Sequence, residues 1–477
     1  MNQDVLLHID GRWIEGSSNQ TIPVINPATE EVVGTAAKAE RADLEQAVAA
    51  AVRGFQIWRH VSAFERGKIM RNAAVLIRER AEQIARAMTI EEGKPLAQAR
   101  LETLSGADMI EWFAEEGRRV YGRVIPARTS GVYQLALREP VGPVAAFTPW
   151  NFPISQVVKK LGAALATGCS IIIKAAEETP ASAAALVQAF TDAGIPAGVI
   201  NLVFGVPAEI SEYLITHPSI RKVSFTGSTA IGKRLASLAG LHMKRVTMEL
   251  GGHAPAIIFD DADLETATTL LLAAKYRNAG QVCIAPTRFL IQENVYENFV
   301  DGFVGRTKAL RVGNGLDEAT EMGPLAHDRR IAAVESVIQD AVDKGASVKA
   351  GGRRFGNKGY FMEPTVITEA PSDALAMNVE PFGPIALLTP FRNFAEAVSE
   401  ANRLPYGLAA YAFTRSAKTA IDVAAAVETG MISINQTGLA LPETPFVGVK
   451  DSGYGAEGGS EGIDAYVNTK FVSQAGV

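Results

Sequence analysis

The sequence contains little cysteine and little histidine. Its 477 residues include only two cysteines, Cys169 and Cys283, and six histidines that show no metal-ligand spacing. Two cysteines cannot form a disulfide framework, so we expect a reducing compartment, and we expect no catalytic metal. No apolar run is long enough to cross a membrane, and the first residues lack the basic and apolar regions of a signal peptide. We therefore expect a cytoplasmic protein that has no membrane partner.

An excess of positive charge is also missing. Lysine and arginine total 46, against 52 aspartates and glutamates, which gives a net charge of −6. This balance argues against nucleic acid or an anionic membrane as the main partner. Hydrophobic residues make up 47% of the chain and charged residues 21%, which is typical of a globular protein with an ample core.

Between Pro143 and Leu250 the sequence alternates strand and helix patterns. Short apolar runs predict buried strands at 144–148, 170–174, 200–204, 222–226 and 245–248. Helical patterns separate them at 154–167, 181–193, 208–216 and 230–239. Repeated strand–helix units build an open parallel sheet, and ligands bind such sheets at the carboxyl ends of the strands. Polar residues or glycines stand at all of these ends, namely Trp150 and Asn151, Lys174 and Glu177, Gly205, Gly227 and Ser228, and Glu249.

Two of these strand ends indicate a dinucleotide. The loop 227–233 follows a strand and opens a helix, so its amides and the helix dipole suit a phosphate. It does not have the G-x-G-x-x-G pattern, so the standard fingerprint is absent. Lys174 either caps its strand or bonds a ribose hydroxyl or a phosphate. Glu177 can bond both ribose hydroxyls but repels a 2′-phosphate, which favours NAD over NADP.

Further α/β and β segments flank this region. A second α/β unit begins after His253, with strand patterns at 256–259, 288–291, 385–388 and 431–434. Two β-prone runs form a hairpin pattern within 122–140, and residues 462–477 alternate like an edge strand. A lone hairpin is marginal in water, so we expect these two segments to form an arm that meets a neighbouring subunit.

One thiol and one carboxylate lie at the two ends of a segment that contains a predicted helix. Glu249 precedes two glycines, and Cys283 follows a helix pattern that runs from its N-cap, Asp263, to Gly280. A helix C-terminus does not favour a thiolate, so a nucleophilic Cys283 needs a base, and Glu249 is the candidate. A lone cysteine is more often a small buried hydrophobe, and a lone glutamate is more often a solvated charge. The positions of Cys283 and Glu249 in the predicted layout favour catalytic roles for both.

The chain resembles the NAD(P)-dependent aldehyde dehydrogenase superfamily over essentially its whole length. The matching segments are 148–153, 174–180, 225–228, 249–252, 280–283, 380–384 and 445–446. The resemblance implies an α/β fold in three parts. These are an open parallel-sheet NAD-binding domain (1–121 and 141–252), an α/β catalytic domain (253–445) and a small β oligomerisation arm (122–140 and 462–477). It also implies a homodimer or a homotetramer.

The resemblance assigns roles to single residues. It implies that Cys283 is the nucleophile and Glu249 the general base. The side-chain amide of Asn151 and the backbone N–H of Cys283 would form the oxyanion hole. The cofactor is expected to be NAD, with NADP as the alternative. The positions matched to cofactor contacts are Thr148, Trp150, Lys174, Glu177, Gly227, Ser228, Glu380 and Phe382.

Within the superfamily the chain is most similar to semialdehyde dehydrogenases. Residues 111–122 resemble succinate-semialdehyde dehydrogenases, and residues 248–255 and 449–455 resemble α-ketoglutarate-semialdehyde dehydrogenases. Arg277 matches a position that binds the substrate carboxylate. Lys159 stands where the family often has arginine, which keeps the charge but loses a bidentate contact. Without the resemblance, both side chains would be interpreted as solvated surface charges.

The expected reaction oxidises a short carboxylate-bearing semialdehyde to the dicarboxylic acid, through a thiohemiacetal and then a thioester on Cys283. Two other enzyme activities stay open, namely a broad-specificity and a CoA-acylating aldehyde dehydrogenase. In the latter a thiol, and not water, accepts the acyl group, and the presence of Glu249 favours water. A catalytically silent structural protein on the same fold is a remote alternative, against which both Cys283 and Glu249 argue.

Overall fold

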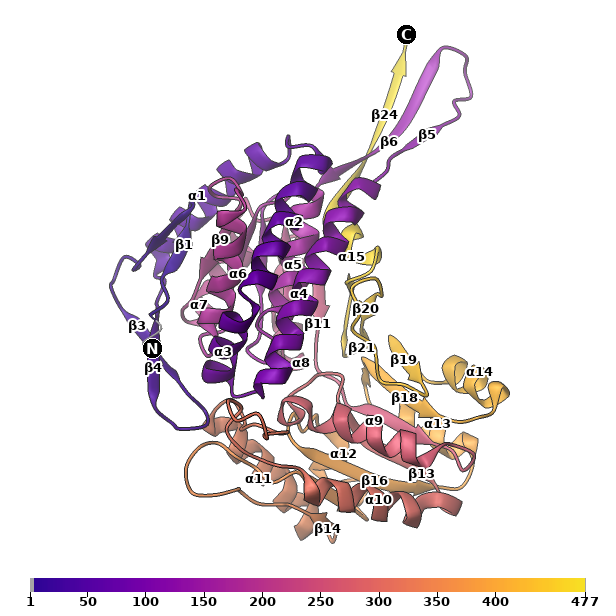
Figure 1. Ribbon diagram of the computed structural model, residues 1–477. Helices are drawn as coiled ribbons and strands as arrows, with labels where there is room; N and C mark the ends of the chain where they lie inside the picture. Colours follow the sequence, from indigo (N-terminus) through magenta and orange to yellow (C-terminus); the bar gives the residue numbers. More distant parts are fainter. Residues whose placement is uncertain (1–3, 477) are drawn as a thin grey trace.

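Two β-sheets, each covered by helices, make up most of the computed structural model, which describes residues 4–476 (Figure 1). The first sheet has eight strands in the order β2-β1-β9-β8-β7-β10-β11-β22. Its outer strands are β1 (Leu7–Ile9), β2 (Arg12–Ile14) and β22 (Gly453–Tyr454). Its five central strands are parallel and agree with the predicted strands to within one residue at each end. They are β7 (Val144–Phe147), β8 (Ile171–Lys174), β9 (Ile200–Val203), β10 (Lys222–Thr226) and β11 (Arg245–Glu249).

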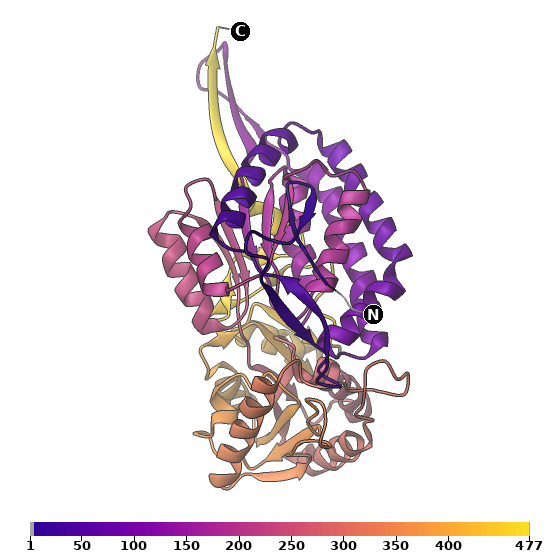
Figure 2. The ribbon, with the colours of Figure 1, turned by 90° about the vertical axis from the view of Figure 1, so that its left-hand side faces the viewer.

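Helices lie on both faces of this sheet (Figure 2). The predicted connecting helices are confirmed as α5 (Ser155–Thr167), α6 (Pro180–Asp192), α7 (Pro207–Thr216) and α8 (Thr229–Leu241). Of the four earlier helices, α1 (Arg41–Trp58) packs on β8 and β9 beside α7. The other three form a further layer over α5 and α6, namely α2 (Ala63–Glu79), α3 (Ala81–Glu92) and α4 (Leu96–Glu116). Because both faces are covered, every residue of β7, β8, β9 and β10 is buried, which explains the apolar runs of β7 and β8.

The second sheet has seven strands in the order β14-β15-β16-β13-β12-β18-β19, and β14 (Ser347–Ala350) alone runs antiparallel to its neighbour. The sequence predicted β12 (Ala254–Ile258), β13 (Pro286–Gln292), β16 (Ile385–Phe391) and β19 (Met431–Ile434). It did not predict β14, β15 (Thr365–Thr368) or β18 (Ala409–Phe413). Alanine is depleted in strands, and three of the five residues of β18 are alanine.

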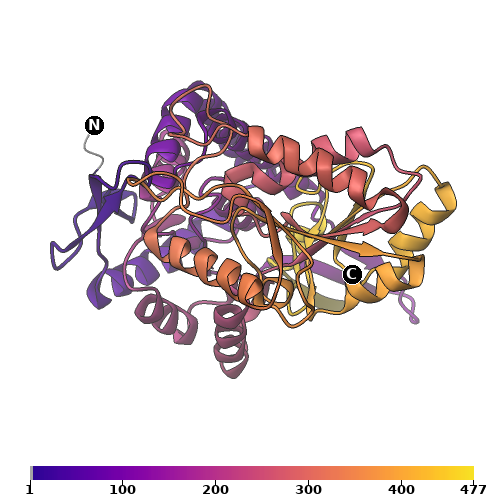
Figure 3. The same ribbon diagram turned by 90° about the horizontal axis from the view of Figure 1, so that it is seen from below.

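Helices also cover the second sheet (Figure 3), and alternate residues of β12 pack against different ones. Ala256 and Ile258 pack in one core cluster with α9 (Leu264–Tyr276), α10 (Tyr296–Ala309) and α11 (Asp328–Asp343). Ile257, between them, packs in another cluster with α13 (Phe394–Asn402) and α14 (Ala417–Ala426). The sheet is thus buried on both faces.

The two segments expected to form an arm, 122–140 and 462–477, pair with each other. β5 (Arg123–Ile125), β6 (Val132–Pro140) and β24 (Val467–Ala475) form an antiparallel sheet in the order β24-β6-β5. This arm extends away from both large sheets (Figure 1). Several of its large apolar side chains are exposed, namely Val124, Tyr133, Leu137 and Phe471.

The helix that leads to Cys283 differs from the prediction at one end. The Asp263 side chain accepts a hydrogen bond from the Thr266 amide, as expected of an N-cap. The helix ends at Tyr276, however, and not at Gly280. Asn278 and Ala279 adopt left-handed backbone conformations, with φ of 48° and 51°, which an α-helix cannot accommodate. A short irregular segment therefore separates the helix from the thiol.

Candidate active site

Cys283 lies where two cavities meet. One cavity, of about 290 Å³, is lined by Cys283 together with Phe152, Lys159, Arg277 and Phe446 among others. The other, of about 510 Å³, is lined by Cys283 and by residues from the strand ends of the first sheet. A molecule in either cavity can reach the thiol, so a substrate and a cofactor can meet there from opposite sides.

The three residues expected to perform the chemistry come together at this point. Glu249 is the last residue of β11, Asn151 lies in the loop after β7, and Cys283 lies in the segment between α9 and β13. Glu249 and Cys283 line the same cavity, and so does Asn151. The Asn151 side-chain amide donates a hydrogen bond to the Gln281 carbonyl at 3.0 Å, which links its loop to the thiol segment.

Burial changes the acidity of both the thiol and the carboxyl group. Loss of solvent raises the pKa of Cys283 to about 12, and the nearby Lys159 ammonium opposes this shift. Glu249 is 2% exposed, and neither of its oxygens has a hydrogen-bond partner among the described residues. Its pKa is raised well above 4.5, first by burial and then by the Glu457 carboxylate. The resting thiol is therefore protonated, and Glu249 is a carboxyl group that can exchange a proton at the site.

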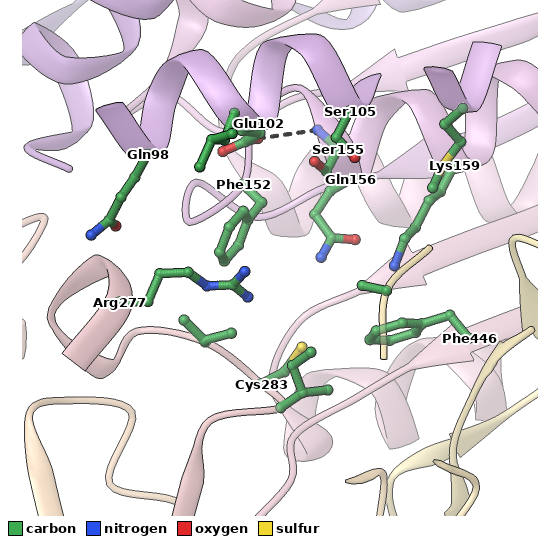
Figure 4. Close-up of a pocket in the computed structure, with 15 residues that line it drawn as sticks. Gln98, Glu102, Ser105, Phe152, Ser155, Gln156, Lys159, Arg277, Cys283 and Phe446 are labelled. Atoms are coloured by element: carbon green, nitrogen blue, oxygen red, sulfur yellow. Dashed lines mark hydrogen bonds between the residues drawn. The ribbon is translucent and has the colours of Figure 1, made fainter. Parts of the chain in front are cut away.

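Lys159 and Arg277 extend into the smaller cavity from opposite walls, above Cys283 (Figure 4). Lys159 is only 4% exposed, so its interpretation as a solvated surface charge is wrong. Its Nζ lies 3.3 Å from the centroid of the Phe446 ring, and burial lowers its pKa. The Arg277 side chain is exposed, with its guanidinium carbon 5.1 Å from the Phe152 ring centroid.

The larger cavity brings together five of the eight expected cofactor residues, namely Trp150, Gly227, Ser228, Glu380 and Phe382. Trp150 contacts Phe382 edge to face, with ring centroids 5.7 Å apart. Glu380 accepts a hydrogen bond from the Gly252 amide at 3.2 Å, and burial raises its pKa to about 7. A Cβ on Gly251 would come within 2.4 Å of a Glu380 carboxylate oxygen, so a larger residue there would displace the Glu380 side chain.

The other three expected cofactor residues, Thr148, Lys174 and Glu177, do not line that cavity but lie at neighbouring strand ends. Lys174 and Glu177 form an ion pair at 2.6 Å, and Glu177 also accepts a hydrogen bond from the Gly205 amide at 3.0 Å. The Thr148 hydroxyl is buried and has no partner among residues 4–476. Beside them, α8 starts at Thr229 without a side-chain cap, so its first amides are available to a phosphate. This donor set fits a dinucleotide.

Sequence reasoning missed a buried charge pair next to Glu249. Lys160 Nζ donates to Glu457 and to the Thr226 hydroxyl, each at 2.6 Å. Glu457 is 3% exposed and belongs to β23 (Ala456–Glu457), far from Glu249 in the sequence. No local pattern connects these residues, so only the folded chain reveals their proximity.

Within the described part of the chain, no group of three or more histidine, cysteine or acidic side chains has an arrangement that could hold a metal ion. None of the helices there has both the length and the apolar character that a membrane span needs.

Comparisons with known proteins agree with this geometry. The model of the aldehyde dehydrogenase family matches residues 13–472. The chain is 48% identical to the 4-(hydroxymethyl)benzenesulfonate dehydrogenase TsaD1 of Comamonas testosteroni, over 98% of this chain and 97% of that protein. It is 42% identical to the glutarate-semialdehyde dehydrogenase of Pseudomonas putida, over 98% and 96% respectively. The crystal structure of succinate-semialdehyde dehydrogenase from Burkholderia pseudomallei superposes with a TM-score of 0.97 at 42% identity, covering 99% of this chain and 98% of that one.

These findings confirm the resemblance, including the similarity to semialdehyde dehydrogenases, and they confirm the α/β fold and the enzyme class. The two large cavities, the buried carboxyl group and the thiol between them lie on a scaffold that the relatives share along almost their full length. The chain therefore belongs to the aldehyde dehydrogenase family, and it is an oxidoreductase that acts on aldehydes with NAD(P).

Proposed function

We propose that this enzyme oxidises a short aldehyde with a carboxylate at its other end, such as succinate semialdehyde or α-ketoglutarate semialdehyde, to the dicarboxylic acid. One observation carries the proposal, namely that Lys159 and Arg277 share a cavity with Cys283. A buried ammonium that lacks a carboxylate partner of its own is favoured when a bound anion supplies one. An aldehyde carbon at the sulfur of Cys283 would bring a terminal carboxylate toward these cations.

In the first half of the proposed reaction, Cys283 is the nucleophile. Its raised pKa means that the thiol has to lose its proton as it attacks, and Glu249 is the base in the same cavity. The sulfur bonds to the aldehyde carbon, which becomes a thiohemiacetal. The Asn151 amide and the Cys283 N–H would donate hydrogen bonds to the oxygen, which has gained negative charge. Trp150, Gly227, Ser228, Glu380 and Phe382 would hold NAD, which would supply the hydride acceptor. Loss of a hydride from the thiohemiacetal carbon leaves a thioester on Cys283.

Before the second half, Glu249 releases to solvent the proton that it took from the thiol. The Glu249 carboxylate then takes a proton from water, whose oxygen attacks the thioester carbon. The C–S bond breaks, the acid leaves, and the proton on Glu249 passes to the sulfur, which restores the thiol. A carboxyl group whose pKa is raised by burial suits this task, because it is a stronger base than a solvated glutamate. Glu249 also distinguishes this reaction from acyl transfer to CoA, which needs no base for water.

We propose NAD as the preferred cofactor, with NADP as the weaker alternative. The Glu177 carboxylate lies beside Lys174 at the end of β8, where it can bond ribose hydroxyls. The same carboxylate would repel a 2′-phosphate. The pairing of Lys174 with Glu177 at 2.6 Å also compensates the lysine charge that a 2′-phosphate would otherwise attract.

A second candidate substrate is an aromatic aldehyde that carries a sulfonate. The relative at 48% identity is named for a benzenesulfonate compound. The smaller cavity supports this candidate, since the rings of Phe152 and Phe446 lie beside the two cations. A sulfonate, like a carboxylate, is an oxyanion that an ammonium can bind.

A substrate panel tests the proposal. The purified enzyme is assayed for NADH or NADPH formation with succinic semialdehyde, α-ketoglutaric semialdehyde, 4-formylbenzenesulfonate and butanal, with and without CoA. We expect a large preference for one anionic aldehyde, with NAD, and independence from CoA. Equal kcat/KM for butanal and every anionic aldehyde would contradict the anion site, and a CoA requirement would contradict hydrolysis. Cys283→Ala is the control, which should lose turnover and still bind NAD.

We also propose roles for the parts of the chain. Residues 1–121 with 141–252 form the NAD-binding domain, and residues 253–445 form the catalytic domain, which carries the nucleophile. The arm formed by residues 122–140 and 462–477 joins subunits into a dimer or tetramer. The arm leaves Tyr133 and Phe471 exposed by 56% and 62%, which favours burial against a second copy. Light scattering of Phe471→Glu should show a smaller assembly than the wild type. An unchanged mass would contradict this use of the arm.

A further inference from the structure

A buried lysine outside the catalytic trio contacts the loop that carries Asn151. Lys94 lies between α3 and α4 and is 1% exposed. Its Nζ donates to the Glu102 carboxylate at 2.5 Å and to the Asn151 carbonyl at 2.8 Å. It also lies 4.0 Å from the centroid of the Phe152 ring. Lys94 therefore holds Asn151 and Phe152, which lie in the loop between β7 and α5.

Glu102 holds the other end of the same loop. Its second oxygen accepts a hydrogen bond from the Ile154 amide at 2.9 Å. The same oxygen accepts one from the Ser155 amide at 3.1 Å (Figure 4). These amides belong to the start of α5, where a carboxylate is favoured by the helix dipole. The Lys94–Glu102 pair thus binds the loop at Asn151 and again at residues 154–155. The backbone from Asn151 to Ser155 therefore has little conformational freedom.

The Asn151 carbonyl also connects this loop to the thiol segment. The Asn278 side chain donates a hydrogen bond to it at 2.9 Å. Asn278 has one of the left-handed conformations between α9 and Cys283. Its backbone N–H donates a hydrogen bond to the Gln98 side chain of α4 at 2.9 Å. One carbonyl therefore receives a donor from the first sheet's helices and a donor from the segment that leads to the nucleophile.

A role in stability alone does not explain this arrangement. A buried ion pair contributes little net stability, and a well-packed apolar pair of similar volume serves folding equally well. An apolar pair, however, cannot donate to a carbonyl or accept from two amides. The charged pair is needed only where the backbone of the Asn151 loop has to keep one position.

We infer that Lys94 and Glu102 are positioning residues that fix the Asn151 amide relative to the Cys283 sulfur. The inference rests on the proposed function, in which Asn151 stabilises the oxyanion. Misplacing a reacting or stabilising group by about 1 Å can cost on the order of 100-fold in rate. Loss of the pair should therefore lower kcat and leave the cofactor cavity unaffected, since neither residue lines it.

The test measures kcat, and KM for NAD, for Lys94→Met and Glu102→Gln. We expect kcat to fall by about 10- to 100-fold in each variant, with KM for NAD changed less than about twofold. Adding Lys94→Met to Asn151→Ala should cause no further loss, because the lysine acts through the asparagine. Glu102→Gln keeps the side-chain volume, so it carries the test if Lys94→Met does not fold.

Lys222→Met is the matched control. Lys222 is as buried as Lys94, but it donates to Thr247 at 2.6 Å at the start of β10, away from the strand ends. We expect this variant to lower the melting temperature without lowering kcat. An equal loss of kcat in both lysine variants, or additive losses in the Lys94→Met/Asn151→Ala double variant, would overturn the inference. If Lys94→Met oxidises aldehydes as fast as the wild type, the inference is wrong and the proposed function stands. If Cys283→Ala oxidises aldehydes, the proposed function itself is wrong.

Discussion

Replacing Lys159 by methionine should separate recognition of the substrate anion from the chemistry at Cys283. The variant keeps the volume of the side chain and removes the buried ammonium. A hydrogen bond to a charged group contributes about 1.5–3 kcal/mol net. At about 1.4 kcal/mol for each factor of ten, kcat/KM for an anionic semialdehyde should fall by about 10- to 140-fold. The assay follows NADH formation at limiting substrate.

Butanal is the internal control for this variant. It has an aldehyde and no anion, so its kcat/KM should change less than about threefold. Lys159→Arg keeps the charge and adds a planar donor set, so it should retain the preference for the anionic substrate. Equal losses for butanal and for the semialdehyde in Lys159→Met would refute the reasoning, because the lysine would then act on the reacting centre.

The same variant should not be less stable than the wild type. Burial lowers the pKa of Lys159 below its ordinary value of 10.5, so the unfolded chain binds this proton more tightly than the folded one. The resulting penalty is complete below the folded pKa and disappears as the pH rises through 10.5. Lys159→Met removes the penalty and loses a cation–π contact with Phe446 of about 0.5–2 kcal/mol. We expect an unchanged or higher melting temperature at pH 7, and a clear decrease would contradict this balance.

Four further predictions concern the other site residues. Asn151→Ala should lower kcat by about 100- to 1,000-fold through loss of an oxyanion donor, and a kcat within threefold of the wild type would exclude that role. The acid limb of the kcat–pH profile should lie well above pH 4.5, because burial raises the pKa of Glu249 and its deprotonated form is the base; the limb should vanish in Glu249→Gln, whereas an unchanged limb would assign it to another group. Glu177→Gln should raise kcat/KM for NADP relative to NAD, since the carboxylate no longer repels the 2′-phosphate; an unchanged ratio would remove Glu177 from cofactor choice. Arg277→Met should weaken anion recognition less than Lys159→Met, because the Arg277 side chain is exposed and its charge is screened, and the reverse order would make Arg277 the main anion contact.

The first sheet could be predicted from sequence because its physics is local. Strands buried on both faces favour continuous apolar runs, and β7 and the first three residues of β8 show them. β10 is as buried but contains Lys222, Ser224 and Thr226. The same rule placed Glu249 and the loop of Asn151 at strand ends. β18 was missed because its alanines fit a helix equally well, and tertiary burial decided the outcome.

The interior of the site could not be predicted in the same way. Nothing near Lys159 in the sequence shows that Phe446, almost 300 positions later, covers its ammonium. The end of α9 depends on left-handed residues that carry side chains, and a glycine pattern pointed to the wrong position. The contacts of Lys94 with Asn151 and Glu102 likewise arise from packing between distant segments.

Trapping the acyl group tests the central claim most directly. Glu249→Gln is mixed with NAD and the preferred semialdehyde until acylation, which the loss of the base also slows, is complete. The sample is then quenched in acid, digested and examined by mass spectrometry. The account predicts a stoichiometric acyl adduct on the peptide that contains Cys283, formed together with one equivalent of NADH. NADH formation with an unmodified Cys283, or an adduct on Cys169, would contradict it.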